Sequence, residues 1–292
     1  HGHISTLKAG LNYADRITTV SPTYARELAL PEFGLGFEGI VAARRGQLSG
    51  ILNGVDLNVW NPATDPHLAA RYDAADPSAR APNRQALMER FGLQLADEAP
   101  LFCIVSRLTP QKGIDLVLAA LPRLLDRGAG LVVLGSGVGG LEEGLRAAAR
   151  YRPQQVGVVI GYDEALSHQM QGGADVIMVP SRFEPCGLTQ LYGLRYGCLP
   201  LVARTGGLAD TVIDANEAAL AAGVATGFQF APITAGALGD AIDRACDAFA
   251  DRPTWRTMMA NAMAHPVGWE ASAKTYKNLY SSILDEIAGD TT

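Results

Sequence analysis

The chain has 292 residues, of which 48% are hydrophobic and 18% charged, so it can bury one or two sizeable cores and is globular rather than disordered. Its net charge of −6 argues against the clustered lysines and arginines that nucleic acids and anionic membranes require. No apolar run approaches the roughly 20 residues of a membrane span, and the first residues lack a signal-peptide pattern. We therefore expect a cytoplasmic protein without nucleic-acid or membrane partners.

The N-terminal quarter of the chain reads as short elements followed by an irregular segment. Patterns and turn residues predict a helix over 7–14, a strand over 17–20, a helix over 23–28 capped by Ser21-Pro22, a loop over 33–39 and a strand over 46–52. The Asn53-Gly54 turn then marks a domain boundary near residue 53. The Pro-rich, charge-mixed segment 62–82 is expected to be a linker or a surface excursion.

From residue 101 the chain alternates between strands and helices. Apolar runs predict strands over 101–105, 131–134, 156–160, 176–179 and 199–203, and amphipathic patterns predict helices over 114–125, 141–150, 165–172, 235–250, 253–263 and 269–287. The strands are continuously apolar, as expected when helices cover both faces of a parallel sheet. The sequence therefore predicts an α/β fold with a Rossmann-like parallel sheet, whose ligands bind at the carboxyl ends of the strands.

Histidines and cysteines give no sign of a metal site. The pair His1 and His3 could bind a metal, but histidines at a chain terminus more often mark the edge of a fragment. The cysteines have no C-x-x-C spacing, and two of them lie in or beside apolar strands, which indicates buried reduced thiols and a reducing compartment. They are Cys103, Cys186, Cys198 and Cys246.

Two cations follow the predicted strand 101–105. Arg107 and Lys112 lie five residues apart between a buried strand and the start of a helix. Charge-assisted hydrogen bonds and the helix dipole at such a place favour a diphosphate, and no metal is needed. The alternative is a solvated surface loop, and the loop alone does not decide between them.

A glycine-rich fingerprint follows the next strand. Residues 135–140 match G-x-G-x-x-G, and Asp163 lies at about the spacing of a ribose-binding acid, so an NAD-dependent oxidoreductase is a second hypothesis. The fingerprint lies in the second strand–helix unit, however, and glycines at such turns also have a purely steric explanation.

The stretch 176–214 contains the third chemically informative loop. Glu184 and Cys186 follow the strand 176–179, and a helix opens near Leu188. A carboxylate at this edge suits sugar hydroxyls, and the free N–H groups of Gly187, Leu188 and Thr189 suit a phosphate. The alternative for Glu184 is a charge that only complements the helix dipole.

The motifs of these loops closely resemble those of bacterial glycogen synthase and plant starch synthase. They are T-V-S-P-T-Y-A-R-E at 19–27, G-I-L-N-G-V-D at 50–56, W-N-P at 60–62, S-R-L-T-P-Q-K-G-I-D-L at 106–116, P-S-R-F-E-P-C-G-L-T-Q-L-Y-G-L-R-Y-G at 180–197 and R-T-G-G-L-A-D-T-V at 204–212. This resemblance implies the GT-B architecture of two facing Rossmann-like domains. It also implies a retaining hexosyltransferase that moves glucose from ADP-glucose to the non-reducing end of an α-1,4-glucan, without a cofactor or metal.

The resemblance also implies roles for individual residues. Arg107 and Lys112 would bind the diphosphate and stabilise charge on the leaving ADP, and Glu184 would bind hydroxyls of the transferred glucose. The remaining substrate-binding residues are Cys186 and Gly187 in the glucose pocket, Leu188 and Thr189 at the distal phosphate, Tyr162 on the adenine and Asn53 near the glucose.

Two departures from the wider GT-B pattern stand out. Many retaining enzymes have a second glutamate eight residues after the first, where this chain has Tyr192, a feature shared by the starch and glycogen synthase branch. The family's N-terminal K-T-G-G-L loop, and the histidine and aspartate that face the glucose from that side, have no counterpart here. We therefore expect a fragment, inactive alone, whose partner is the missing N-terminal domain of the same enzyme.

The implied domains are a remnant of the N-terminal domain over 1–52, the nucleotide-sugar domain over 53–266, and a helix over 267–292 that crosses back to the N-terminal domain. Besides the transferase and the oxidoreductase, a non-catalytic module that binds ADP remains a third hypothesis. Nothing in the loops themselves selects adenine over uracil, so the choice of ADP-glucose rests on the resemblance.

Overall fold

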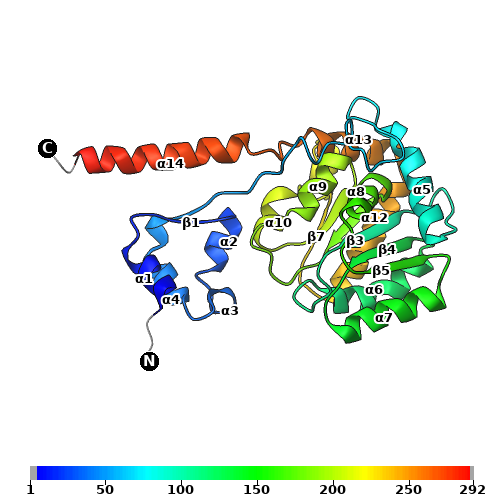
Figure 1. Ribbon diagram of the computed structural model, residues 1–292, viewed down its shortest axis with the longest axis horizontal. Helices are drawn as coiled ribbons and strands as arrows, with labels where there is room; N and C mark the ends of the chain where they lie inside the picture. The colour runs from blue at the N-terminus through cyan, green and yellow to red at the C-terminus, as the bar shows by residue number, and fades with distance from the viewer. Residues whose placement is uncertain (1–4, 290–292) are drawn as a thin grey trace.

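The computed structural model describes residues 5–289 and shows a large α/β unit, a smaller group of N-terminal elements and a long C-terminal helix (Figure 1). The histidines at positions 1 and 3 lie outside the described residues. No helix within residues 5–289 is long and apolar enough to cross a membrane.

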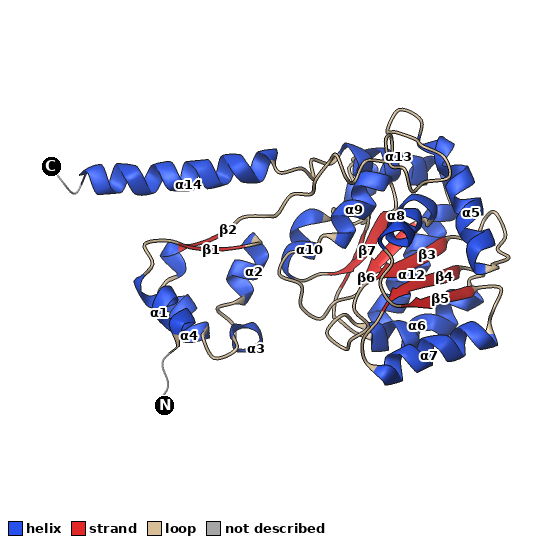
Figure 2. Cartoon of the chain, in the orientation of Figure 1, coloured by secondary structure: helices blue, strands red, loops and turns tan. Residues whose placement is uncertain are grey.

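A six-stranded parallel sheet forms the centre of the large unit (Figure 2). Its strands are β3 (Leu101–Val105), β4 (Gly130–Gly135), β5 (Val156–Ile160), β6 (Val176–Val179), β7 (Leu199–Ala203) and β8 (Phe228–Phe230). The first five agree with the predicted strands to within one residue at either end, and the parallel α/β prediction is confirmed. The short strand β8 was not predicted.

Helices cover both faces of this sheet. Those of the large unit are α5 (Ala81–Phe91), α6 (Ile114–Asp126), α7 (Gly139–Tyr151), α8 (Glu164–Gly173), α9 (Thr189–Tyr196), α10 (Gly206–Thr211), α11 (Glu217–Ala221), α12 (Ala235–Ala250) and α13 (Arg252–Ala264). Along β3, Phe102 and Ile104 join one apolar cluster, whereas Leu101 and Cys103 join the other. This two-sided burial explains why the strands are apolar throughout.

The strand order decides where a ligand can bind. The order β5-β4-β3-β6-β7-β8 runs outward in both directions from the neighbouring strands β3 and β6. The loops after β3 and β6 therefore lead to opposite faces of the sheet, and a crevice opens between them at the carboxyl ends of the strands. The motif loops 106–113 and 180–188 are the two walls of that crevice.

The N-terminal elements pack against the large unit through α2. They are α1 (Thr6–Tyr13), β1 (Ile17–Thr19), α2 (Pro22–Glu27), α3 (Pro31–Gly34), α4 (Glu38–Ala43) and β2 (Leu48–Gly50). Ser21 caps α2 as predicted, because its hydroxyl accepts a hydrogen bond from Tyr24 N at 2.9 Å. The predicted loop over 33–39 is wrong at both ends, because Pro31 at the first helical turn opens α3 and α4 begins at Glu38.

The segment 62–82 is a packed excursion rather than a free linker. Asp65 is buried and lies 2.7 Å from His168 Nδ1, and the Tyr196 hydroxyl also donates to it. Burial alone would raise the pKa of Asp65, but these hydrogen bonds and one from the His67 N–H outweigh it and lower that pKa. The indole of Trp60 stacks between the rings of His168 and Tyr192, at centroid distances of 3.9 and 3.6 Å. Tyr192, where many retaining enzymes have glutamate, thus has a packing role here.

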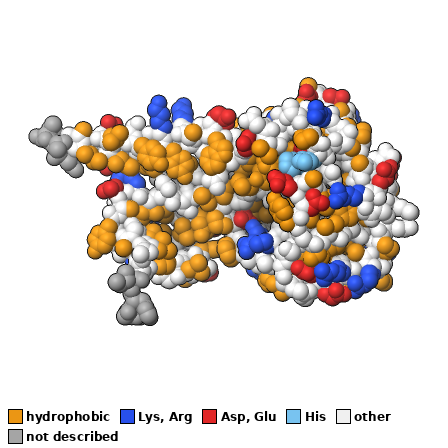
Figure 3. Space-filling view, viewed as in Figure 1, with side chains coloured by type: hydrophobic (Ala, Val, Ile, Leu, Met, Phe, Trp, Pro, Cys, Tyr) orange, Lys and Arg blue, Asp and Glu red, His pale blue; other side chains and the backbone are white. Residues whose placement is uncertain are grey.

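The C-terminal helix α14 (Glu270–Gly289) runs alongside the N-terminal elements (Figure 1). Ser272 donates to Leu52 O, and Arg16 forms an ion pair with Glu286. Apolar side chains remain exposed along this helix and the neighbouring elements (Figure 3), among them Tyr280 and Leu284.

Candidate functional site

A cavity of about 300 Å³ opens at the crevice between β3 and β6. Polar groups from both motif loops meet in it, beside apolar side chains from the two strands. The lining residues are Val105, Ser106, Lys112, Met178, Val179, Pro180, Ser181, Glu184, Gly187, Leu188 and Thr189. The structure therefore brings together five of the predicted site residues, which come from two separate loops.

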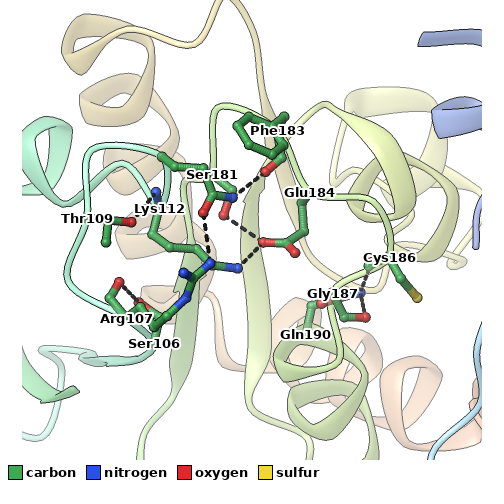
Figure 4. Close-up of polar contacts among 11 residues, drawn as sticks. Ser106, Arg107, Thr109, Lys112, Ser181, Phe183, Glu184, Cys186, Gly187 and Gln190 are labelled. Carbon is green, nitrogen blue, oxygen red and sulfur yellow. Dashed lines mark hydrogen bonds and ion pairs between the residues drawn. The ribbon is translucent and has the colours of Figure 1, made fainter. Parts of the chain in front are cut away.

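An ion pair stands at the centre of this cavity. Lys112 Nζ lies 2.5 Å from Glu184 Oε2, which also accepts a hydrogen bond from Ser181 Oγ at 2.9 Å (Figure 4). Both charged side chains are largely buried, at 18% and 10% exposure. No described residue donates to Glu184 Oε1, and the ammonium has two further N–H groups. The pair can therefore accept from a hydroxyl and donate to an anion at the same time.

Close backbone contacts hold the two loops together. Gly113 has φ +72°, and a Cβ atom there would lie 2.0 Å from Pro180 O. Only glycine combines this left-handed conformation with so close an approach. On the same side, Arg182 makes two hydrogen bonds of 2.8 and 2.7 Å to the carboxylate of Asp115 in the first turn of α6. Hydrogen bonds from Arg182 lower the pKa of Asp115, so this tie is ionic at neutral pH.

Helix α9 differs from its neighbours at the same edge of the sheet. Carboxylates accept from backbone N–H groups at or just before the start of three of them: Glu142 from Gly137 N, two residues before α7, Asp163 from Leu166 N in α8 and Glu27 from Gly206 N in α10. No side chain caps α9, and no described group accepts from the N–H groups of residues 187–189. This N-terminus is thus free to bind an anion.

Four predicted site residues lie outside the cavity lining. Arg107 is exposed and reaches the other loop through Gln111, which accepts from it at 3.3 Å and donates to Phe183 O. Tyr162 is 87% exposed. Asn53 lines a neighbouring cavity near the hinge to the N-terminal elements.

Cys186 is buried and points away from Glu184 in Figure 4. Burial raises the pKa of this thiol, so it is protonated at neutral pH and shapes the loop rather than acting as a nucleophile.

In the fingerprint loop 135–140, Glu142 accepts from Gly137 N and Leu108 O accepts from Val138 N. Added Cβ atoms at Gly135 and Gly137 would lie 1.9 Å from Ser106 O and 2.3 Å from Leu108 O, so the steric explanation of these glycines holds. Asp163, the candidate ribose ligand, caps α8 and forms an ion pair with Arg90 at 3.1 Å. The geometry therefore does not favour a dinucleotide at this turn.

Two residues of the site region were not predicted. Ser181 precedes Glu184 by three residues, and this spacing was a local signal for their contact. Glu27 accepts hydrogen bonds from Thr205 Oγ1 and Gly206 N, which are 178 and 179 residues away in the chain, and the sequence carries no local signal for these contacts. Among residues 5–289, no group of three histidine, cysteine or acidic side chains is arranged to hold a metal ion.

The family model described as "Glycosyl transferases group 1" matches residues 87–255, more than half of the chain and all of the cavity. The chain belongs to the group 1 glycosyl transferases. A second model, "Starch synthase catalytic domain", matches residues 1–43.

Relatives of this glycosyl transferase include proteins named glycogen synthase. That of Roseobacter denitrificans is 63% identical over 284 residues, and that of Mesorhizobium japonicum is 56% identical over 286. These alignments cover 97% and 98% of the chain but 59% of each relative, so the chain spans about three fifths of their length.

Solved structures show the same architecture. The catalytic domain of starch synthase IV from Arabidopsis thaliana, bound to ADP and acarbose, matches with a TM-score of 0.87 and 35% identity, over 94% of this chain and 57% of that one. Sucrose-phosphate synthase from Thermosynechococcus elongatus matches with a TM-score of 0.63 and 23% identity, over 96% and 61%, which shows the fold alone. The predicted GT-B fold and the resemblance to glycogen and starch synthases are confirmed.

Proposed function

We propose that this chain is the nucleotide-sugar-binding part of an ADP-glucose-dependent glycogen synthase. The enzyme would transfer glucose from ADP-glucose to the non-reducing end of an α-1,4-glucan with retention of configuration, in the cytoplasm. The observation that carries the proposal is the Lys112–Glu184 pair, which faces the uncapped N-terminus of α9 at the topological switch point. The names of the relatives and the ADP in the starch synthase structure support the choice of donor.

The cavity supplies complementary groups for the two halves of such a donor. Lys112 and the N–H groups of residues 187–189 bind the diphosphate, the distal phosphate being nearest Leu188 and Thr189. Arg107 swings in from the exposed side of its loop to join them. The positive charges and the dipole of α9 stabilise the negative charge that develops on the leaving ADP. This stabilisation is greater in the transition state than in the bound donor, so it lowers the barrier to transfer.

Glu184 positions the hexose. Its free Oε1 accepts from sugar hydroxyls, while the ion pair with Lys112 keeps the carboxylate next to the phosphates. Gly187 lines the pocket beside the sugar and the buried Cys186 shapes its loop from behind. Asn53 approaches from the hinge, and the exposed ring of Tyr162 stacks on the adenine. We also propose the division into residues 1–52, 53–266 and 267–292, with 1–52 and α14 belonging to the acceptor side of the enzyme.

The test uses a chimera in which the N-terminal part of the Roseobacter denitrificans glycogen synthase precedes this chain. Lys112→Ala and Glu184→Ala should each lower kcat/KM for glucosyl transfer from ADP-glucose by roughly 10²-fold or more, since each removes a charged contact to the transition state. Arg146→Ala on the exposed face of α7 is the matched control. Unchanged kinetics in both site variants would refute the assignment.

The alternative is an ADP-binding module without turnover, for which the N–H groups of residues 187–189 beside Lys112 would also serve. Calorimetry on the 292-residue chain separates the two. An active chimera contradicts the alternative. Binding of ADP by the 292-residue chain, together with a chimera that transfers no glucose, supports it.

A further inference from the structure

A second large cavity lies at the opposite edge of the sheet from the Lys112–Glu184 pair. Its volume is about 760 Å³, and it lies between the start of α5, the end of α12 and α13. Asp97 and Asp175, which precede β3 and β6, both line it, so it opens at the amino ends of the strands. Figure 1 shows α5 on the side of the large unit that faces away from α10.

The charge of this cavity differs from that of the whole chain. Its lining contains four arginines, Arg80, Arg84, Arg252 and Arg256, against three aspartates, although the chain has a net charge of −6. Arg80 and Arg84 both pair with the buried carboxylate of Asp175. The cavity is thus a locally positive region that internal ion pairs do not neutralise.

Two of these guanidinium groups have no carboxylate partner within residues 5–289. The Cζ atom of Arg252 lies over the Phe249 ring, 3.9 Å from its centroid, and this side chain donates to Asp97 O. Arg256 donates through Nε to Arg252 O at 3.2 Å, which leaves its terminal N–H groups without an acceptor. A guanidinium has five donors in one plane, so the two side chains have several N–H groups left to bind an anion.

A buried donor in the same lining is also unsatisfied. Arg80 is 7% exposed, and its Nε has no hydrogen-bond partner in the described part of the chain. This Nε has almost no accessible surface, so Arg80 acts on an anion in the cavity through its positive charge and not through a hydrogen bond from Nε.

The rest of the lining suits an organic ligand rather than a bare ion. Apolar side chains such as Ala81 and Met259 contribute much of the wall, and the volume exceeds that of a phosphate several-fold. Asp76 and Ser78 line the same space and can bind hydroxyl groups. We propose that this cavity binds a small hydroxylated phosphate monoester, with its phosphate on Arg252 and Arg256 and its hydroxyl groups on Asp76 and Asp97.

The test is calorimetric titration of the 292-residue chain with glucose 6-phosphate, and with glucose and inorganic phosphate as partial ligands. We expect saturable binding of the ester, and weaker binding of each partial ligand. The double variant Arg252→Ala/Arg256→Ala should bind the ester roughly tenfold or more weakly, since it loses hydrogen bonds to a charged group. The variant Arg146→Ala/Arg150→Ala, which removes two arginines of α7 that have glutamate partners, should bind normally.

Because Arg252 packs on Phe249, the single variant Arg256→Ala provides a second test in which only one peripheral hydrogen bond within the protein is lost. It should also bind the ester several-fold more weakly. Excess ADP should not displace the ester, since the two cavities lie at opposite edges of the sheet, and this result is independent of the proposed function. Absence of saturable binding, equal binding by the arginine variants, displacement by ADP, or equal affinity for inorganic phosphate would overturn the proposal.

Discussion

Two strand-to-helix turns at one edge of the sheet differ in sequence and in the N–H groups that they leave free. The turn from β4 to α7 has the glycine fingerprint, whereas the turn from β6 to α9 has one glutamate and two small residues near the helix start. In the first, Glu142 already accepts from Gly137 N. In the second, the N–H groups of residues 187–189 open into a cavity beside Lys112.

The difference lies in which N–H groups near each helix start already have an acceptor within the chain. Every helix start is a potential anion site, because its first N–H groups have no partner within the helix. Carboxylates of the chain accept from such N–H groups at α8 and α10, and Glu142 accepts from Gly137 N just before α7. At α9 no described carboxylate does so, and the N–H groups of residues 187–189 face the cavity beside Lys112.

The largest expected effect in this comparison comes from giving α9 the carboxylate that its neighbours have. Leu188→Asp places an acid at the N-cap of α9, where it competes with a phosphate and repels it. We expect roughly 100-fold weaker binding of ADP by the chain, measured by calorimetry. The same variant should raise the free energy of unfolding by about 1 kcal/mol, since aspartate caps helices and leucine does not.

The matched control is Glu142→Gln at the β4 turn, which removes the charge from an occupied N-terminus outside the cavity. It should leave the affinity for ADP unchanged. Equal loss of affinity in both variants would show that the two turns do not differ as described.

A smaller effect is expected from the glycine that lets the two loops meet. Gly113→Ala introduces a side chain at φ +72° and a contact of 2.0 Å with Pro180 O, so it should lower the free energy of unfolding by about 1–3 kcal/mol. Gly92→Ala is the control, because Gly92 has a similar φ of +68° but no atom within 4 Å of the added Cβ. Denaturant titration should find Gly113→Ala clearly less stable than Gly92→Ala, and equal values would mean that the close approach is not a constraint.

The smallest effect concerns the tie between Arg182 and Asp115. Both side chains are 40% exposed, so Asp115→Asn should lower the free energy of unfolding at pH 7 by at most about 1 kcal/mol. The folded state lowers the pKa of Asp115, so its contribution is complete above the unfolded pKa and disappears as pH falls through the lower folded value. The stability difference between wild type and variant should thus be constant from pH 7 to 5 and shrink below about pH 4. A difference that grows with acid would contradict this sign.

Much of the large unit could be predicted because buried parallel strands are continuous apolar runs. The strand β8 was missed because it has three residues with Gln229 in the middle, which is too short to show a hydrophobic periodicity. Helix α5 was missed because its sequence is largely polar and follows a Pro-rich segment, while its stability comes from packing against α8. Tertiary contacts, which no local pattern encodes, decided both elements.

The candidate site was predictable for a similar reason. Lys112 and Glu184 each follow a buried strand, so both had to lie at the carboxyl edge. That β3 and β6 are neighbours, which brings the two charges into contact, depends on the strand order and could not be read from periodicity. The role of Glu27 at α10 depends on the packing of the N-terminal elements, so it could not be predicted from the sequence either.

The most direct test of the central claim is a crystal structure of this chain with ADP. Our account predicts the diphosphate in the 300 Å³ cavity, with an oxygen within hydrogen-bond distance of Lys112 Nζ and the distal phosphate on the N–H groups of Leu188 and Thr189. A diphosphate bound at the β4 turn near Gly137, with the Lys112–Glu184 cavity free of nucleotide, would contradict it.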